Sequence, residues 1–134
     1  MLEEIHRLGE EKLSFSFETT LSGRSHFPML RGLRQNGYSI HLFFLWVEDV
    51  KLALARIAGR VEHGGHNVPE PIVRRRFDRG LLNLVRLYRP VLDSWAVLDN
   101  STEMPRLIVS EQGGVLSVHN PGLFAKLTKV VSIA

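Results

Sequence analysis

The sequence predicts an α/β fold with a mainly parallel sheet, and three observations support this prediction. Segments with helical spacing alternate with short apolar segments typical of strands. One of these, residues 38–47, is apolar on both faces, as in parallel strands that helices cover on either side. The length of 134 residues and the apolar share of 44% suit one globular domain. We therefore expect a single domain over residues 1–134.

The first part of the chain is expected to contain two helices and two strands. Apolar residues recur at three-residue spacing in residues 1–12, which predicts a helix. Residues 13–18 alternate apolar and polar side chains, which predicts a strand that ends in a polar turn. A second helix, 25–36, is followed by Gly37, a residue type that readily adopts the left-handed conformation at helix ends. The apolar strand 38–47 comes next.

The second part begins with Asp49, whose side chain is suited to cap the helix that follows it. Pro90 marks the limit of the longest predicted helix, because proline cannot continue a helix. Two glycines at 113–114 between apolar segments predict a β-hairpin. The elements expected after residue 49 are helix 50–62, helix 70–89, strand 95–98, hairpin strands 106–110 and 115–118, and helix 121–131.

Composition excludes several classes of protein. The chain has no cysteine, which excludes disulfide bridges, thiolate metal sites and a cysteine nucleophile. The longest apolar run, residues 42–47, is too short to span a bilayer, and the first residues lack the pattern of a signal peptide. We therefore expect a cytoplasmic protein without a membrane partner. The net charge of +3 is weak support for nucleic-acid binding.

Polar clusters follow three of the predicted strands, at the edge where parallel α/β sheets bind ligands. Glu18, Thr20 and Arg24 bring a carboxylate, a hydroxyl and a cation into one short segment. This pattern fits either a substrate-binding edge or a simple capped turn. In the second cluster, Glu48-Asp49, a helix cap explains Asp49 better. The third, Asp99-Asn100, has the composition of an ordinary turn.

Arginines gather on one side of the long predicted helix, opposite its apolar side. Such a stripe repels itself unless an anion neutralises it. It fits either a solvated helix face or an arginine lid over a polyphosphate, in which each guanidinium stabilises charge on the transferring oxygens. Arg74 and Arg76 flank the stripe. At about 100° per residue, the side chains that fall within about 80° of one another are Arg75, Arg79, Arg86 and Arg89.

The two histidines of His63-Gly64-Gly65-His66 are the strongest metal-ligand pattern in the chain. They stand three residues apart in a glycine loop, without a third ligand nearby. We therefore predict no metal site there and attribute the glycines to hinge motion.

One combination of motifs runs through residues 8–110, nearly the whole chain. It consists of Phe15-Ser16-Phe17-Glu18-Thr19-Thr20-Leu21-Ser22-Gly23, Gly37-Tyr38, Leu45-Trp46, Leu52-Ala53-Leu54-Ala55-Arg56-Ile57, Arg60-Val61, Gly64-Gly65-His66-x-Val68-Pro69-Glu70, Ile72-x-Arg74-Arg75-Arg76-Phe77, Leu82-x-Leu84 and Asp99-Asn100-Ser101. Together these motifs resemble the zeta-toxin-like family of P-loop kinases, in particular the bacterial branch described as predicted ATPases or zeta toxin proteins.

The resemblance implies a Rossmann-like P-loop kinase that transfers the γ-phosphoryl group of ATP with Mg²⁺. Characterised zeta toxins phosphorylate a UDP-amino sugar, so the expected acceptor is a small molecule such as a nucleotide sugar. By position in the motifs, the implied roles are acceptor binding for Glu18 and Thr20, with Arg24 beside them, phosphate stabilisation by lid residues Arg75 and Arg79, with Arg74 and Arg76 near them, and contact near the nucleotide base for Asp99 and Asn100.

The chain departs from this family in one respect that bears on activity. No Gly-x-x-x-x-Gly-Lys-Ser/Thr loop occurs in the sequence, and the family's catalytic Asp segment, which follows that loop, is also missing. We therefore expect the part of a kinase domain that follows the P-loop, with a sheet that lacks the P-loop strand. The strands ending at Phe17 and Val47 would then pair directly.

Three hypotheses about function follow. The first is a kinase domain that is inactive alone, because nothing anchors ATP and Mg²⁺, and that allows for an antitoxin or a strand-supplying partner. The second is a non-catalytic module that binds a sugar nucleotide or another anion. The third, nucleic-acid binding through the arginine helix, is the weakest, because no aromatic stacking platform accompanies the arginines.

Overall fold

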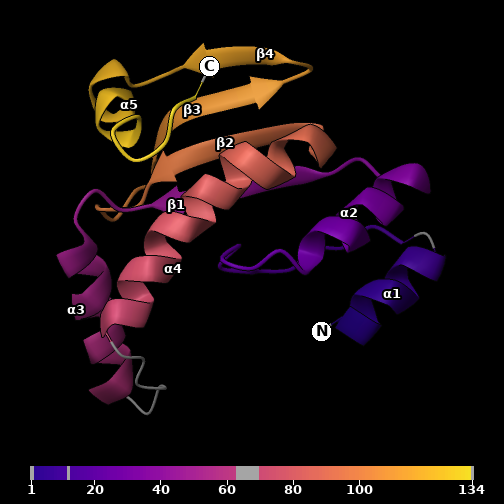
Figure 1. The fold of residues 1–134 in the computed structure, drawn as a ribbon, viewed down its shortest axis with the longest axis horizontal. Coiled ribbons are helices and arrows are strands. Elements are labelled where there is room, and N and C mark those ends of the chain that lie inside the picture. Colours follow the sequence, from indigo (N-terminus) through magenta and orange to yellow (C-terminus); the bar gives the residue numbers. More distant parts are fainter. Residues whose placement is uncertain (1, 12, 63–69, 134) are drawn as a thin grey trace.

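The computed structural model describes residues 2–11, 13–62 and 70–133 (Figure 1). Within these ranges, helices and strands follow the predicted order, with the exception of residues 13–18. Their bounds are α1 Leu2–Glu11, α2 His26–Gln35, β1 His41–Trp46, α3 Val50–Glu62, α4 Glu70–Asn83, the π-helical turn η1 Leu84–Tyr88, the 3-10 turn η2 Arg89–Val91, β2 Ser94–Asp99, β3 Arg106–Gln112, β4 Val115–Val118 and α5 Pro121–Leu127.

The four strands form one mixed sheet in the order β1-β2-β3-β4. Only β1 and β2 are parallel, and they pair from His41 with Ser94 to Trp46 with Asp99. Both β2 with β3 and β3 with β4 are antiparallel. The prediction of a mainly parallel, Rossmann-like P-loop sheet is therefore wrong.

Connection length is the physical reason for this topology. A parallel crossover needs about a dozen residues or more, and in this chain α3 and α4 lie between β1 and β2. By contrast, β2 reaches β3 through residues 100–105 alone, and β3 reaches β4 through a two-glycine turn. Gly113 and Gly114 adopt φ values of 58° and 79°, as the turn of a tight hairpin requires. The predicted hairpin is thus confirmed.

Residues 13–18 do not form the predicted strand, and they do not pair with β1. This segment is extended but outside the sheet. Its two aromatic rings are half-buried and pack elsewhere: Phe15 lies 5.8 Å from the ring of Tyr38, and Phe17 lies 5.4 Å from the ring of His26. The alternating pattern therefore reflects aromatic packing against the α2 region. The predicted direct pairing of the strands ending at Phe17 and Val47 is wrong as well.

The sheet is covered unequally on its two faces. Helix α4 runs across one face (Figure 1), and Phe44 on that face packs beneath it. On the opposite face of β1, Phe43 is 75% exposed and Leu45 is 55% exposed. Strand β1 is also an edge strand. Burial of this strand on both faces, which its sequence predicted, is therefore wrong.

The buried core lies between α4, η1 and the sheet, with α2 and α5 at its sides. None of the helices described is long and apolar enough to cross a membrane. The side chains buried most completely in this core are Leu81, Leu84, Tyr88, Val97, Ile108, Val109 and Leu127.

Candidate functional site

The turn that follows residues 13–18 lies directly against α4. The Thr20 carbonyl oxygen is so close to Gly80 that a Cβ atom added there would lie 2.6 Å from it. The same Cβ would lie 3.2 Å from the ring of Phe44, on the sheet beneath the helix. Since real Cβ atoms do not approach a carbonyl oxygen this closely, the contact requires glycine at position 80. The predicted acceptor-binding segment and the arginine helix are thus brought together.

Two side chains of the helical segment donate hydrogen bonds to backbone carbonyls of this turn. Asn83, at the end of α4, donates a hydrogen bond to the Leu21 carbonyl at 2.8 Å and a longer one to the Gly23 carbonyl at 3.5 Å. Tyr88, at the end of η1, donates its hydroxyl proton to the Gly23 carbonyl at 2.8 Å. Hydrogen bonds to the Leu21 and Gly23 carbonyls therefore hold residues 19–24, which we call the docked turn.

The docked turn presents polar groups outward and one apolar group inward. Leu21 is buried and has a φ of 59°, an uncommon backbone conformation for a residue other than glycine. The Thr20 and Ser22 hydroxyl oxygens are 2.8 Å apart, and Thr19 accepts a hydrogen bond from the Leu21 amide. Glu18, before the turn, and Arg24, at its end, are exposed. All three predicted acceptor-binding residues therefore lie in or beside the docked turn.

Helical geometry ranks the arginines of α4 by their distance from this turn. At about 100° per residue, Arg76 lies about 20° around the helix from Asn83, which contacts the turn. Arg79 lies about 40° from Asn83, whereas Arg75 lies about 80° from it. All three side chains are exposed, while the side chain of Arg74 lies outside what the structure describes. Measured from Gly80, which touches the turn directly, Arg76 lies about 40° away, Arg79 about 100° and Arg75 about 140°. Arg76 is therefore the arginine best placed toward the turn, Arg79 lies to one side of it, and Arg75 faces away.

Sequence reasoning missed three residues of this site, namely Gly80, Asn83 and Tyr88. A signal was present, because Gly80 falls on the apolar side of the predicted helix, where a larger side chain would normally fill the core. A glycine at such a position indicates that another backbone segment approaches closely. The sequence alone did not show which segment this is.

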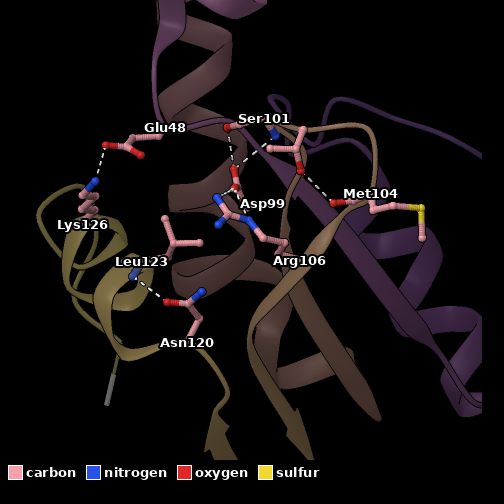
Figure 2. A network of polar contacts seen from close by, with 9 residues as sticks. Glu48, Asp99, Ser101, Met104, Arg106, Asn120, Leu123 and Lys126 are labelled. Carbon is pink, nitrogen blue, oxygen red and sulfur yellow. Dashed lines mark hydrogen bonds and ion pairs between the residues drawn. The ribbon is translucent and has the colours of Figure 1, made fainter.

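A second polar cluster lies at the carboxyl ends of the two parallel strands (Figure 2). Asp99 is fully buried and accepts hydrogen bonds from the Ser101 hydroxyl at 2.6 Å and from Arg106 Nε at 3.1 Å. Burial would raise the pKa of Asp99, but these hydrogen bonds outweigh it and hold the pKa below its ordinary value. The carboxylate thus joins β2 to β3 and orients the half-exposed Arg106.

The neighbouring residues in this region also make structural contacts. The Asn100 amide donates to the Trp46 carbonyl at 2.7 Å, which extends the parallel pairing by one residue. Glu48 forms an ion pair with Lys126 of α5 at 2.6 Å (Figure 2). Asp49 accepts a hydrogen bond from the Lys51 amide at 2.9 Å, which confirms its predicted role as a helix cap. A nucleotide-binding role for Asp99 and Asn100 stays a prediction.

The predicted loop around His63 and His66 lies outside the described residues. The same holds for Gly64 and Gly65 between them, to which hinge motion was attributed.

Comparison with curated proteins finds a relative in Haemophilus influenzae that is described only as an uncharacterized protein. The two chains are 37% identical over 68 residues, which is 51% of this chain and 49% of the relative. The match thus spans about half of either protein. No protein-family model matches the sequence, and no solved structure matches it.

Proposed function

We propose that this chain is the acceptor-binding part of a zeta-toxin-like small-molecule kinase and that it binds an anionic metabolite between the docked turn and the arginines of α4. The nucleotide-sugar acceptor follows from the resemblance, as do ATP and Mg²⁺ as the phosphoryl donor. Because the sequence has no phosphate-binding loop, the chain alone binds the acceptor without phosphorylating it. The proposed location is the cytoplasm.

The observation that carries this proposal is the close approach of Thr20 to Gly80. It sets the exposed side chain of Thr20 beside a helix whose exposed Arg76 and Arg79 form no ion pair within the described residues. Guanidinium groups bind phosphate oxygens through paired hydrogen bonds. Hydroxyls and a carboxylate such as Glu18 are the groups that recognise sugar hydroxyls. The arrangement therefore suits a molecule that carries both phosphate and sugar.

The chemistry divides between the two sides of the site. Arg76 and Arg79 supply positive charge for a diphosphate, and their attraction for it weakens as salt screens the exposed charges. Thr20 and Ser22 hold the sugar by hydrogen bonds, while the Glu18 carboxylate accepts a hydrogen bond from a hydroxyl group of the acceptor. The catalytic role that the resemblance implies for Arg75 and Arg79 requires a bound donor nucleotide, so in this chain Arg79 acts as a binding residue.

Calorimetric titration of the purified chain with UDP-N-acetylglucosamine and with pyrophosphate tests this function. We expect binding of both, with an affinity that falls as salt is raised. Arg76→Ala and Arg79→Ala should each weaken binding by roughly 10- to 150-fold, the range for a hydrogen bond to a charged group. Arg7→Ala is the matched control, because Arg7 pairs with Glu4 and Glu11 on the exposed surface of α1.

Failure of either compound to bind the unmodified chain would refute the proposal. Equal effects of the Arg7 and Arg79 variants would also contradict it, since they would show a response to net charge alone. A separate assay, ATP turnover with Mg²⁺ and UDP-N-acetylglucosamine, distinguishes the inactive kinase part from an active enzyme. Turnover would show that the chain phosphorylates its acceptor without a phosphate-binding loop.

A further inference from the structure

We propose that Asn83 and Tyr88 are positioning residues that set the docked turn in its ligand-binding conformation before any ligand arrives, and that the π-helical turn η1 exists to align them. The proposal concerns residues 19–24 and the helical segment beneath them. Its statement about ligand affinity rests on the proposed function. Its statement about the conformation of the turn does not.

Both side chains converge on the Gly23 carbonyl of the docked turn. Asn83 and Tyr88 each donate to the Gly23 carbonyl, and Asn83 also donates to the Leu21 carbonyl. Tyr88 is fully buried, so its hydroxyl would be costly to bury without this acceptor. Burial raises the pKa of Tyr88, which keeps the phenol protonated as a donor throughout the physiological range.

The π-helical turn changes the orientation of Tyr88 relative to Asn83. Asn83 and Tyr88 are five residues apart, which in a regular α-helix would place them about 140° apart around the axis. In a π-helical turn, residues five apart lie above one another, because the hydrogen bonds join positions i and i+5. The segment Leu84–Tyr88 is such a turn. It therefore brings Asn83 and Tyr88 to the same side of the helix, facing the docked turn.

The hydrogen bonds from Asn83 and Tyr88 flank a residue with an uncommon backbone conformation. Leu21 has a φ of 59° in the left-handed region, which side chains other than glycine seldom adopt. A polypeptide turn released from its contacts would leave such a conformation. Here it stays because Leu21 is buried and the carbonyls on either side of Ser22 are held from the helix. A turn set in advance spares the ligand the cost of ordering it.

Hydrogen–deuterium exchange on the ligand-free chain tests the positioning role. Tyr88→Phe removes only the hydroxyl, and Asn83→Leu removes the amide donor with little change in volume. Each should speed exchange of the amides in residues 19–24 by roughly 3- to 10-fold, the effect of one lost hydrogen bond. Exchange in the buried strand β2 reports global stability and should change less.

Tyr38→Phe is the matched control for the first variant. Tyr38 also donates its hydroxyl proton to backbone carbonyls, those of Leu8 and Leu13, at 2.9 and 2.8 Å. Its loss should speed exchange near residues 8–13 and leave the docked turn unchanged. Pyrophosphate titration provides the second readout, in which Tyr88→Phe should weaken binding by roughly 3- to 10-fold and Tyr38→Phe should not.

Two results would overturn the proposal. One is unchanged exchange in residues 19–24 of the Tyr88 and Asn83 variants. The other is faster exchange of the turn combined with unchanged pyrophosphate affinity, which would make the bonds purely structural. If the unmodified chain does not bind pyrophosphate, the proposed function fails, while the exchange experiment still decides whether Asn83 and Tyr88 set the turn.

Discussion

Replacement of Gly80 by alanine tests the contact on which the candidate site depends. The added methyl group would lie 2.6 Å from the Thr20 carbonyl oxygen, so the helix and the docked turn must move apart. Overpacking of this kind costs about 1–3 kcal/mol. Alanine also favours the helix over glycine by about 1 kcal/mol, which offsets part of that cost. A single variant would therefore mix two effects of opposite sign.

Gly59→Ala separates the two effects. Gly59 lies within α3, and a Cβ atom added there meets no atom within 4 Å. This variant should therefore gain the helix preference alone and become more stable by up to about 1 kcal/mol. Since both variants share the gain, the difference between their free energies of unfolding isolates the steric cost at Gly80. We expect Gly80→Ala to be the less stable of the two by about 1–3 kcal/mol.

Urea unfolding, followed by circular dichroism, measures both variants under one set of conditions. Pyrophosphate titration of the same samples adds a functional readout, in which Gly80→Ala should weaken binding because the docked turn is displaced. Equal stabilisation by the two substitutions would refute the reasoning. It would mean that Thr20 does not approach Gly80 in solution and that the turn and the arginine helix are separate.

Three further predictions concern the sheet. Asp99→Asn should lower the free energy of unfolding by about 1–3 kcal/mol, measured by urea unfolding, because Arg106 loses its charged partner; an unchanged midpoint would contradict this. Asp99 and Glu111 have pKa values below those of the unfolded chain, Glu111 chiefly through Arg89. Stability should therefore be complete above about pH 5 and fall as the pH drops through their lowered values, whereas Glu111→Gln should flatten this loss; a loss that begins near pH 7 would point to other groups. Phe43→Thr should change the free energy of unfolding by no more than about 0.5 kcal/mol, measured by urea unfolding, because Phe43 is mostly exposed; a large loss of stability would show that its ring is buried.

Local features of the chain were predictable because neighbouring residues determine them. The helix ending before Gly37, the cap at Asp49 and the two-glycine hairpin each depend on the conformational preferences of a few adjacent residues. The interruption of the long helix near Pro90 follows from the missing amide proton of proline. The π-helical turn Leu84–Tyr88 before it was not predicted from these local preferences.

The candidate site was predictable only in part. Glu18, Thr20 and Arg24 were singled out by their position after an apolar segment, and their role in binding an acceptor stays a prediction. Gly80, Asn83 and Tyr88 were missed, because what each side chain contacts lies about 60 residues away along the chain. The relative importance of Arg76 and Arg75 likewise depends on which side of α4 meets the turn.

The sequence by itself determined the type and order of the helices and strands, apart from residues 13–18, because these depend on local preferences and periodicity. Their ends were less well predicted, since the helix expected over 121–131 ends at Leu127 and the α-helix expected over 70–89 ends at Asn83. Only the tertiary structure decided that the sheet is mixed, that β1 has one exposed face, and that residues 19–24 dock on α4. An apolar residue favours burial against any suitable partner, so its pattern indicates that burial is favourable without specifying the partner. Partner choice is a property of the assembled chain, and in this protein it creates the candidate site.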